Sequence, residues 1–251
     1  MPLILSPSEK PVIAEPHNTW SRSTFIKGML GLLALGSLDL ESCKKTTETG
    51  GSGTTVNGYT FGSGDIGVLN YLYMIEQIQV AFYSTLNASG ILSPLISGAM
   101  GQKPPYYYLL TDIYDHQLAH CTFLNLALGT NALPSLNLDF SRIDFTSLSA
   151  CLQAAHQFQN TEAQAYTGVS QYFTSTAFLT IAAQIGAVES RHSAFITGLL
   201  NNSTNTNFNA YFDSSLVDPN NGYEIGFSPS QVYAFYKPYL KTALDASTLP
   251  G

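Results

Sequence analysis

The chain has 251 residues, and 45% of them are hydrophobic, enough for one domain of ordinary size with appendages. Charged residues make up only 11%, with 17 acidic against 10 basic side chains and no long basic run. This balance argues against a nucleic-acid partner.

Residues 1–43 have the pattern of an export signal. Arg22 and Lys27 flank the start of the apolar stretch "MLGLLALGSL", which at about 10 residues is too short to span a bilayer as a permanent helix. The following "LESC" resembles a bacterial lipobox, in which Cys43 becomes the lipidated first residue of the mature protein. The alternative is a buried N-terminal helix with a chance cysteine.

Residues 44–63 are rich in Gly, Ser and Thr and are predicted to be a flexible tether before a folded domain over 64–251. The sequence therefore predicts that the protein is exported and lies in the periplasm or on the cell surface. Its expected partner is the membrane, through lipid on Cys43.

The folded part has the apolar periodicity of helices and few strand signals. Asp65 is the expected N-cap of the first helix. The segment 129–145 lacks helical periodicity and is long enough to traverse a bundle. The sequence thus predicts an all-α fold: a four-helix bundle with a long crossover between helices two and three, plus a short C-terminal helix. An up-and-down bundle with a loose loop is the alternative. The helices are expected over 65–86, about 106–128, about 146–173, about 177–200 and 228–244.

Polar side chains interrupt all four apolar faces near their middles. Buried ionisable groups are rarely left without partners, so four interruptions at matching heights point to a common site. In di-metal carboxylate bundles, two helices supply a Glu each and the other two supply Glu-x-x-His. The interrupting residues are Glu76; Gln117 with His120; Gln159 with Glu162; and Glu189 with His192.

Four stretches, in order, resemble bacterial ferritin-like domain proteins related to plant desiccation-related proteins: "LNYLYMIEQIQVAFY", "DHQLAHCTFL", "AAHQFQNTEAQAYTGV" and "AVESRHSAF". The resemblance covers about residues 65–245. It implies a ferritin-like bundle with a metal site in its core, and it does not imply one biochemical activity.

Carried over position by position, the resemblance implies four metal ligands: Glu76, His120, Glu189 and His192. Gln117 and Gln159 stand where the family pattern has glutamates, and Gln79 replaces a frequent second Glu of the first helix. Glu162 could supply a third carboxylate. An amide is a weak oxygen donor and cannot bridge two cations as a carboxylate does.

Three interpretations follow: one divalent ion (Fe, Mn or Zn) on the four ligands, an empty polar core, or a surviving dinuclear centre using Glu162. The shortage of carboxylates favours the empty core, so the expected cofactor is none or one metal ion. The predicted function is a non-catalytic envelope or stress-protective protein with a degenerate di-metal site; the alternative is a metal-dependent oxidase or iron-handling protein. His116 and His156 are expected to be ordinary histidines outside the site.

Overall fold

The computed structural model describes residues 58–92, 105–202 and 213–251. The predicted export signal, Cys43 and most of the tether lie outside the described residues. In the part that is described, no helix is both long and apolar enough to cross a membrane.

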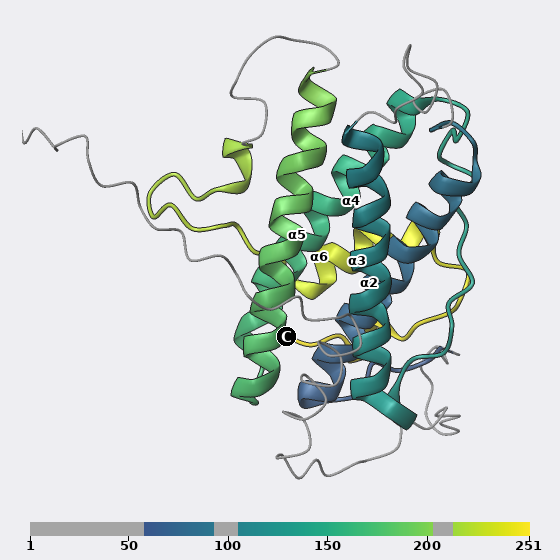
Figure 1. Cartoon of the computed structure of the whole chain (residues 1–251). Coiled ribbons are helices and arrows are strands. Elements are labelled where there is room, and N and C mark those ends of the chain that lie inside the picture. The colour runs from purple at the N-terminus through teal and green to yellow at the C-terminus, as the bar shows by residue number, and fades with distance from the viewer. Residues whose placement is uncertain (1–57, 93–104, 203–212) are drawn as a thin grey trace, which may run out of the picture. The chain divides into compact units, whose positions relative to one another are not determined.

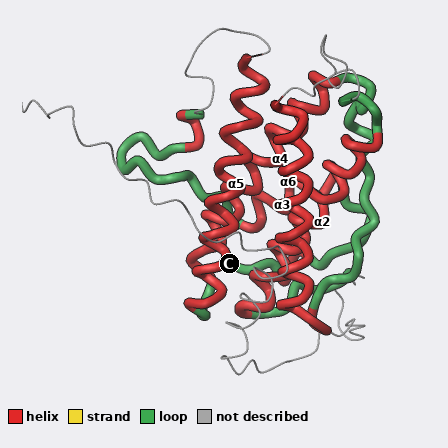
Figure 2. Tube along the Cα trace, viewed as in Figure 1, coloured by secondary structure: helices red, strands yellow, loops and turns green. Residues whose placement is uncertain are grey.

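Four long helices form a bundle in the described part of the chain, and these residues form no strand beyond isolated bridges (Figures 1 and 2). α2 pairs with α3, and α4 pairs with α5. The predicted all-α, ferritin-like bundle is therefore confirmed. The helices are α2 (Gly64–Ala88), α3 (Pro105–Leu128), α4 (Leu148–Val169) and α5 (Thr176–Asn202).

The long connection between α3 and α4 crosses the length of the bundle (Figure 1). The start of α2 lies beside the end of α3, where the Asn70 amide donates to the Asn131 carbonyl at 2.8 Å. It also lies beside the end of α4, where the Asp65 carboxylate accepts from the Thr174 N–H at 2.7 Å. α3 and α4 therefore run in the same direction, as the crossover predicts. The prediction that Asp65 is the N-cap of α2 is wrong: Ser63 is the N-cap, and Asp65 lies in the first turn.

The C-terminal helix is shorter than the sequence suggests. α6 (Pro229–Tyr236) begins with a capping box between Ser228 and Gln231. It gives way to a single 3-10 turn over Lys237–Tyr239. Pro238 has no N–H and cannot continue the helical hydrogen bonds, so the expected continuation of the helix through 244 does not form.

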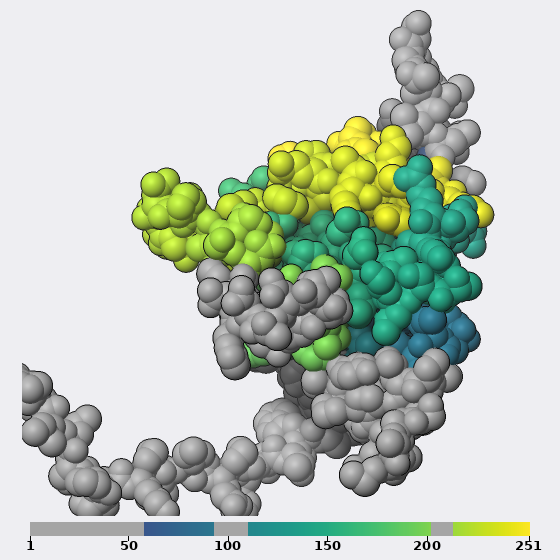
Figure 3. All heavy atoms as spheres, turned by 90° about the horizontal axis from the view of Figure 1, so that it is seen from above, coloured from purple at the N-terminus to yellow at the C-terminus, as the bar shows by residue number. Residues whose placement is uncertain are grey.

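An aromatic cluster attaches the crossover and the C-terminal segment to the bundle. Figure 3 shows the C-terminal residues, in yellow, lying against the teal of the crossover and α4. The Tyr236 hydroxyl donates to the Phe158 carbonyl at 3.1 Å and accepts from the Gln79 amide at 3.3 Å. α6 thereby seals one side of the core at the level of the polar residues. The rings around Phe158 are those of Phe82, Phe140, Phe235, Tyr236 and Tyr239.

Candidate metal centre

The seven polar residues that interrupt the apolar faces meet in the core of the bundle. The two histidines are 7% and 6% exposed and the other five side chains have no exposed surface. The periodicity of the sequence thus placed all of them on the inward faces. They are Glu76 on α2, Gln117 and His120 on α3, Gln159 and Glu162 on α4, and Glu189 and His192 on α5.

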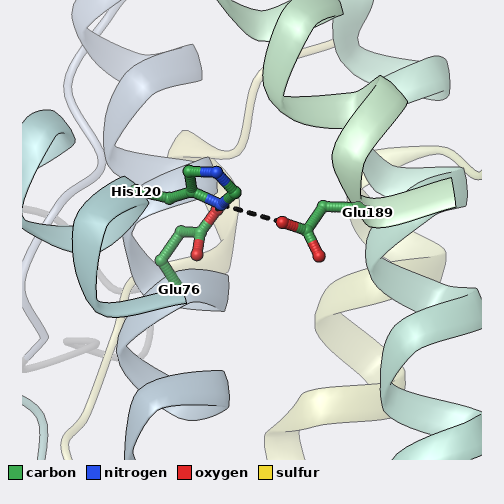
Figure 4. A group of neighbouring side chains, drawn as sticks. All are labelled: Glu76, His120 and Glu189. Carbon is green, nitrogen blue, oxygen red and sulfur yellow. Dashed lines mark ion pairs between the residues drawn. The ribbon is translucent and has the colours of Figure 1, made fainter. Parts of the chain in front are cut away.

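Three of these side chains converge on one point (Figure 4). His120 Nδ1 lies 2.8 Å from Glu189 Oε1 and 3.7 Å from Glu76 Oε1. The first pair is close enough for an ion pair, but neither atom has a partner in hydrogen-bond geometry. Oε2 of Glu76 is also buried without a hydrogen-bond partner. One ligand atom from each residue lies within 4.8 Å of the others, so the group could hold a metal ion.

Tyr166 holds the first of these carboxylates in place. Its hydroxyl donates to Glu76 Oε1 at 2.5 Å. Burial, together with the neighbouring carboxylates, raises the pKa of Tyr166 well above its ordinary value, so the hydroxyl stays a donor. The sequence places Tyr166 on the inward face of its helix, one turn after Glu162, but gives no sign of this bond to α2.

The other half of the centre is closed by hydrogen bonds. The Gln117 amide nitrogen donates to Glu162 Oε2 at 2.9 Å and to Glu189 Oε2 at 2.7 Å. Gln159 donates to the same Glu162 oxygen at 2.9 Å. His192 Nδ1 lies 2.9 Å from Glu189 Oε2. The structure therefore brings His192 to Glu189, but on the oxygen that faces away from His120.

Burial limits how many of the three carboxyl groups, those of Glu76, Glu162 and Glu189, can be ionised at once. Burial raises the pKa of Glu76 and Glu162 well above 4.5, and the charge of Glu189 raises both further. Burial opposes ionisation of Glu189 too, but His192 and His120 together hold its pKa below the ordinary value. In the absence of a cation, these shifts favour the protonated forms of Glu76 and Glu162 and the ionised form of Glu189, because buried like charges in a low dielectric are costly.

Three further residues singled out in the sequence, Gln79, His116 and His156, are not among the residues that meet at the centre. Gln79 is fully buried, but its amide donates to the Phe158 carbonyl and the Tyr236 hydroxyl. His156 lies 3.2 Å from the Asn160 amide and takes no part. His116 is exposed, as expected, yet its Nδ1 lies 2.9 Å from Nε2 of His192. Sequence reasoning missed this contact, because it joins residues 76 positions apart on two helices.

The ligand atoms of Glu76, His120 and Glu189 suit one divalent ion. Two carboxylates balance a double charge, and a neutral imidazole completes an N/O set that Fe, Mn and Zn all accept. His120 Nδ1 lies 2.8 Å from one carboxylate oxygen and 3.7 Å from the other, so one ion could contact all three residues. The buried oxygens without donors are what a cation would satisfy. Such an ion would tie α2, α3 and α5 together and act as a Lewis acid.

A model of the ferritin-like domain matches residues 64–202, which contain all four bundle helices and every residue of the candidate centre. No curated protein matches the chain. Because the matched region is more than half of the chain, the chain belongs to the ferritin-like domain family.

Proposed function

We propose that this protein is an exported, lipid-anchored ferritin-like protein of the bacterial envelope whose core holds one divalent metal ion in a structural, non-catalytic role. The convergence of Glu76, His120 and Glu189 carries the metal part of the proposal. The short apolar run, the "LESC" motif and the Gly/Ser/Thr tether support the anchor.

A structural role follows from where the ligands come from. Glu76, His120 and Glu189 belong to three helices, and they include both helix pairs of the bundle. One ion would cross-link them and stabilise the folded state by RT ln(1 + [L]/Kd), about 2.7 kcal/mol at 100 times Kd. Such stabilisation suits a protein that protects under stress, in line with the resemblance to desiccation-related proteins.

The burial of the candidate metal centre supports a non-catalytic role. The carboxylates of Glu76, Glu162 and Glu189 have no exposed surface. The neighbouring histidines, His120 and His192, are less than a tenth exposed. A large substrate would have to displace the surrounding side chains to reach the ion. The amides of Gln117 and Gln159 also occupy the side of the centre that faces Glu162.

Metal content tests the proposal directly. The full chain, purified without chelators, should carry about one Fe, Mn or Zn ion per molecule, and removal of that ion should lower the thermal midpoint. Glu76→Gln should abolish metal retention, because it removes a charged ligand and changes the shape little. Glu224→Gln is the matched control, since Glu224 lies on the C-terminal segment and not in the core.

Other outcomes separate the competing functions. Native protein without metal, and without a thermal shift in Fe(II), Mn(II) or Zn(II), would support an empty polar core and refute the metal role. Two ions per chain together with oxidation of added Fe(II) by O₂ would support the oxidase or iron-handling alternative.

A further inference from the structure

The amide of Gln117 sits where two carboxylates from different helices converge. Its nitrogen is 2.9 Å from Glu162 Oε2 on α4 and 2.7 Å from Glu189 Oε2 on α5. Both acceptors are fully buried. Two buried carboxylate oxygens that share one neighbour need either hydrogen-bond donors or a cation at that point.

The acceptors around this point require the nitrogen end of the amide. A reversed amide would place its carbonyl oxygen 2.7 Å from Oε2 of the Glu189 carboxylate, and two acceptors at this separation would repel each other. In the orientation present, the amide oxygen of Gln117 is the atom left without a hydrogen-bond partner. The two N–H bonds to carboxylates therefore determine the arrangement.

We propose that the Gln117 carboxamide takes the place of a second metal ion and closes that half of the centre, so that the centre holds one ion and not two. The inference builds on the proposed metal at Glu76, His120 and Glu189, and it concerns the other face of Glu189. The two oxygens of that carboxylate have opposite surroundings. Oε1 faces His120 without hydrogen-bond geometry, whereas Oε2 accepts from Gln117 and lies 2.9 Å from His192 Nδ1.

Gln159 also donates to this group of carboxylates, but it contacts only one of them. It donates to Glu162 Oε2 at 2.9 Å, so this oxygen has two amide donors. It has no hydrogen bond to Glu189, unlike Gln117, which bridges both carboxylates. Gln117 and Gln159 thus play unequal parts at the centre, and position 117 controls the second site.

Charge explains why an amide is sufficient to exclude a second ion. Glu76, Glu162 and Glu189 together bring three negative charges against the four positive charges of two divalent ions. The amide adds no charge and its N–H groups occupy the oxygens that a second ion would need. Gln117→Glu would supply the fourth negative charge with nearly the same shape. Without metal, the added carboxylate would face Glu162 and Glu189 at short distance and destabilise the fold.

The experiment compares metal binding by the parent chain, Gln117→Glu and Gln79→Glu, each produced and refolded with Mn(II) in excess. Gln79 is the matched control, because it is equally buried but donates to Phe158 and Tyr236 and not to carboxylates. Bound Mn(II) is counted after equilibrium dialysis, and electron paramagnetic resonance distinguishes an isolated ion from an exchange-coupled pair. We expect one ion in the parent, two coupled ions in Gln117→Glu and one in Gln79→Glu.

The outcomes separate this inference from the proposed function. Two ions in the parent would overturn the closure, whatever the variants do. A folded Gln117→Glu variant that binds no more Mn(II) than the parent would overturn it as well. A parent with no ion and a variant with two coupled ions would refute the proposed function but still show that Gln117 blocks the second position. A gain of an ion in Gln79→Glu as well would show that any buried carboxylate suffices, and would overturn the assignment to position 117.

Discussion

His116 and His192 meet edge to edge between α3 and α5. Their ring planes are only 11° apart with centroids 5.2 Å apart, and Nδ1 of His116 lies 2.9 Å from Nε2 of His192. Nearly coplanar rings at this separation share an in-plane N–H···N hydrogen bond, not a face-to-face stack. An exposed histidine is therefore linked through a buried one to Glu189, which His192 contacts at 2.9 Å.

His116 is predicted to position the centre without binding metal. Removing it with His116→Ala leaves His192 free to turn away from Glu189, and outer hydrogen-bond partners of metal ligands typically contribute 10–100-fold in affinity. We expect the affinity for Mn(II) or Zn(II) to fall about tenfold, with the number of bound ions unchanged. Competition with a chromophoric chelator measures this change.

Rescue distinguishes positioning from a general effect on stability. His116→Gln keeps a donor near His192 and should recover part of the affinity. His156→Ala, which removes a half-buried histidine outside the centre, should leave the affinity unchanged. Equal losses in His116→Ala and His116→Gln would contradict the positioning role.

The sequence predicts the fold because the apolar faces repeat every three to four residues and the polar interruptions fall on the same faces. The crossover follows from the length of 129–145 and from its lack of periodicity. The C-terminal region shows the limit of this approach. Its apolar pattern continues past Pro238, but backbone geometry ends the helix there, and Leu240 instead forms an isolated bridge with Leu138.

The contents of the candidate centre are predictable, but its contacts are not. Periodicity places Gln159 and Glu162 on one face, and both are fully buried. It cannot show that Glu162 accepts from two amides, or that Glu189 presents its oxygens to different neighbours. Those features depend on how side chains of α3, α4 and α5 meet in the core. The contact of His116 with His192 depends on the packing of α3 against α5 and has no signal in either helix alone.

Gly168 allows the C-terminal segment to pass directly over α4. A Cβ at this position would lie 1.9 Å from the Phe227 carbonyl oxygen, and the Phe227 N–H donates to the Gln164 carbonyl at 3.0 Å. Gly168→Ala must therefore displace backbone, and overpacking of this kind costs about 1–3 kcal/mol. We expect a lower free energy of unfolding, measured by chemical denaturation.

The neighbouring Thr167 provides the control for this change. Its hydroxyl donates only within its own helix, to the Ala163 carbonyl, so Thr167→Ala should have little effect. A Gly168→Ala variant as stable as the parent would show that the 226–228 segment does not need this close approach.

Cys43 is predicted to carry the membrane anchor. If the lipobox is used, the mature protein begins at a lipidated Cys43 and fractionates with membranes, and Cys43→Ser should move it to the soluble fraction. Intact-mass analysis of the native protein checks the modification. Membrane-associated protein with an unmodified Cys43 would contradict the prediction, and Cys151→Ser, which changes a buried thiol, is the control for loss of a cysteine.

The stability of the metal-free protein is predicted to fall as pH rises from about 5 to 8. Burial raises the pKa of Glu76 and Glu162 well above 4.5 in the folded state, while the unfolded chain has ordinary carboxyls. Between the two values the folded state binds more protons, so each carboxyl removes about 1.4 kcal/mol of stability per pH unit until its folded pKa is passed. Glu189 acts in the opposite sense, but only below 4.5, because its folded pKa is lowered.

Metal binding should reverse this trend, because the ion replaces the proton on Glu76 and its affinity rises as protons are lost. Thermal midpoints of the metal-free and Mn(II)-loaded protein across this pH range test both statements, and the difference between them should widen towards pH 8. In the Glu76→Gln and Glu162→Gln double variant, the metal-free slope should flatten, because two neutral amides replace the raised carboxyls. A metal-free midpoint that is constant or rises from pH 5 to 8 would show that these carboxyls are already ionised in the core, and that the charge of the centre is balanced in another way.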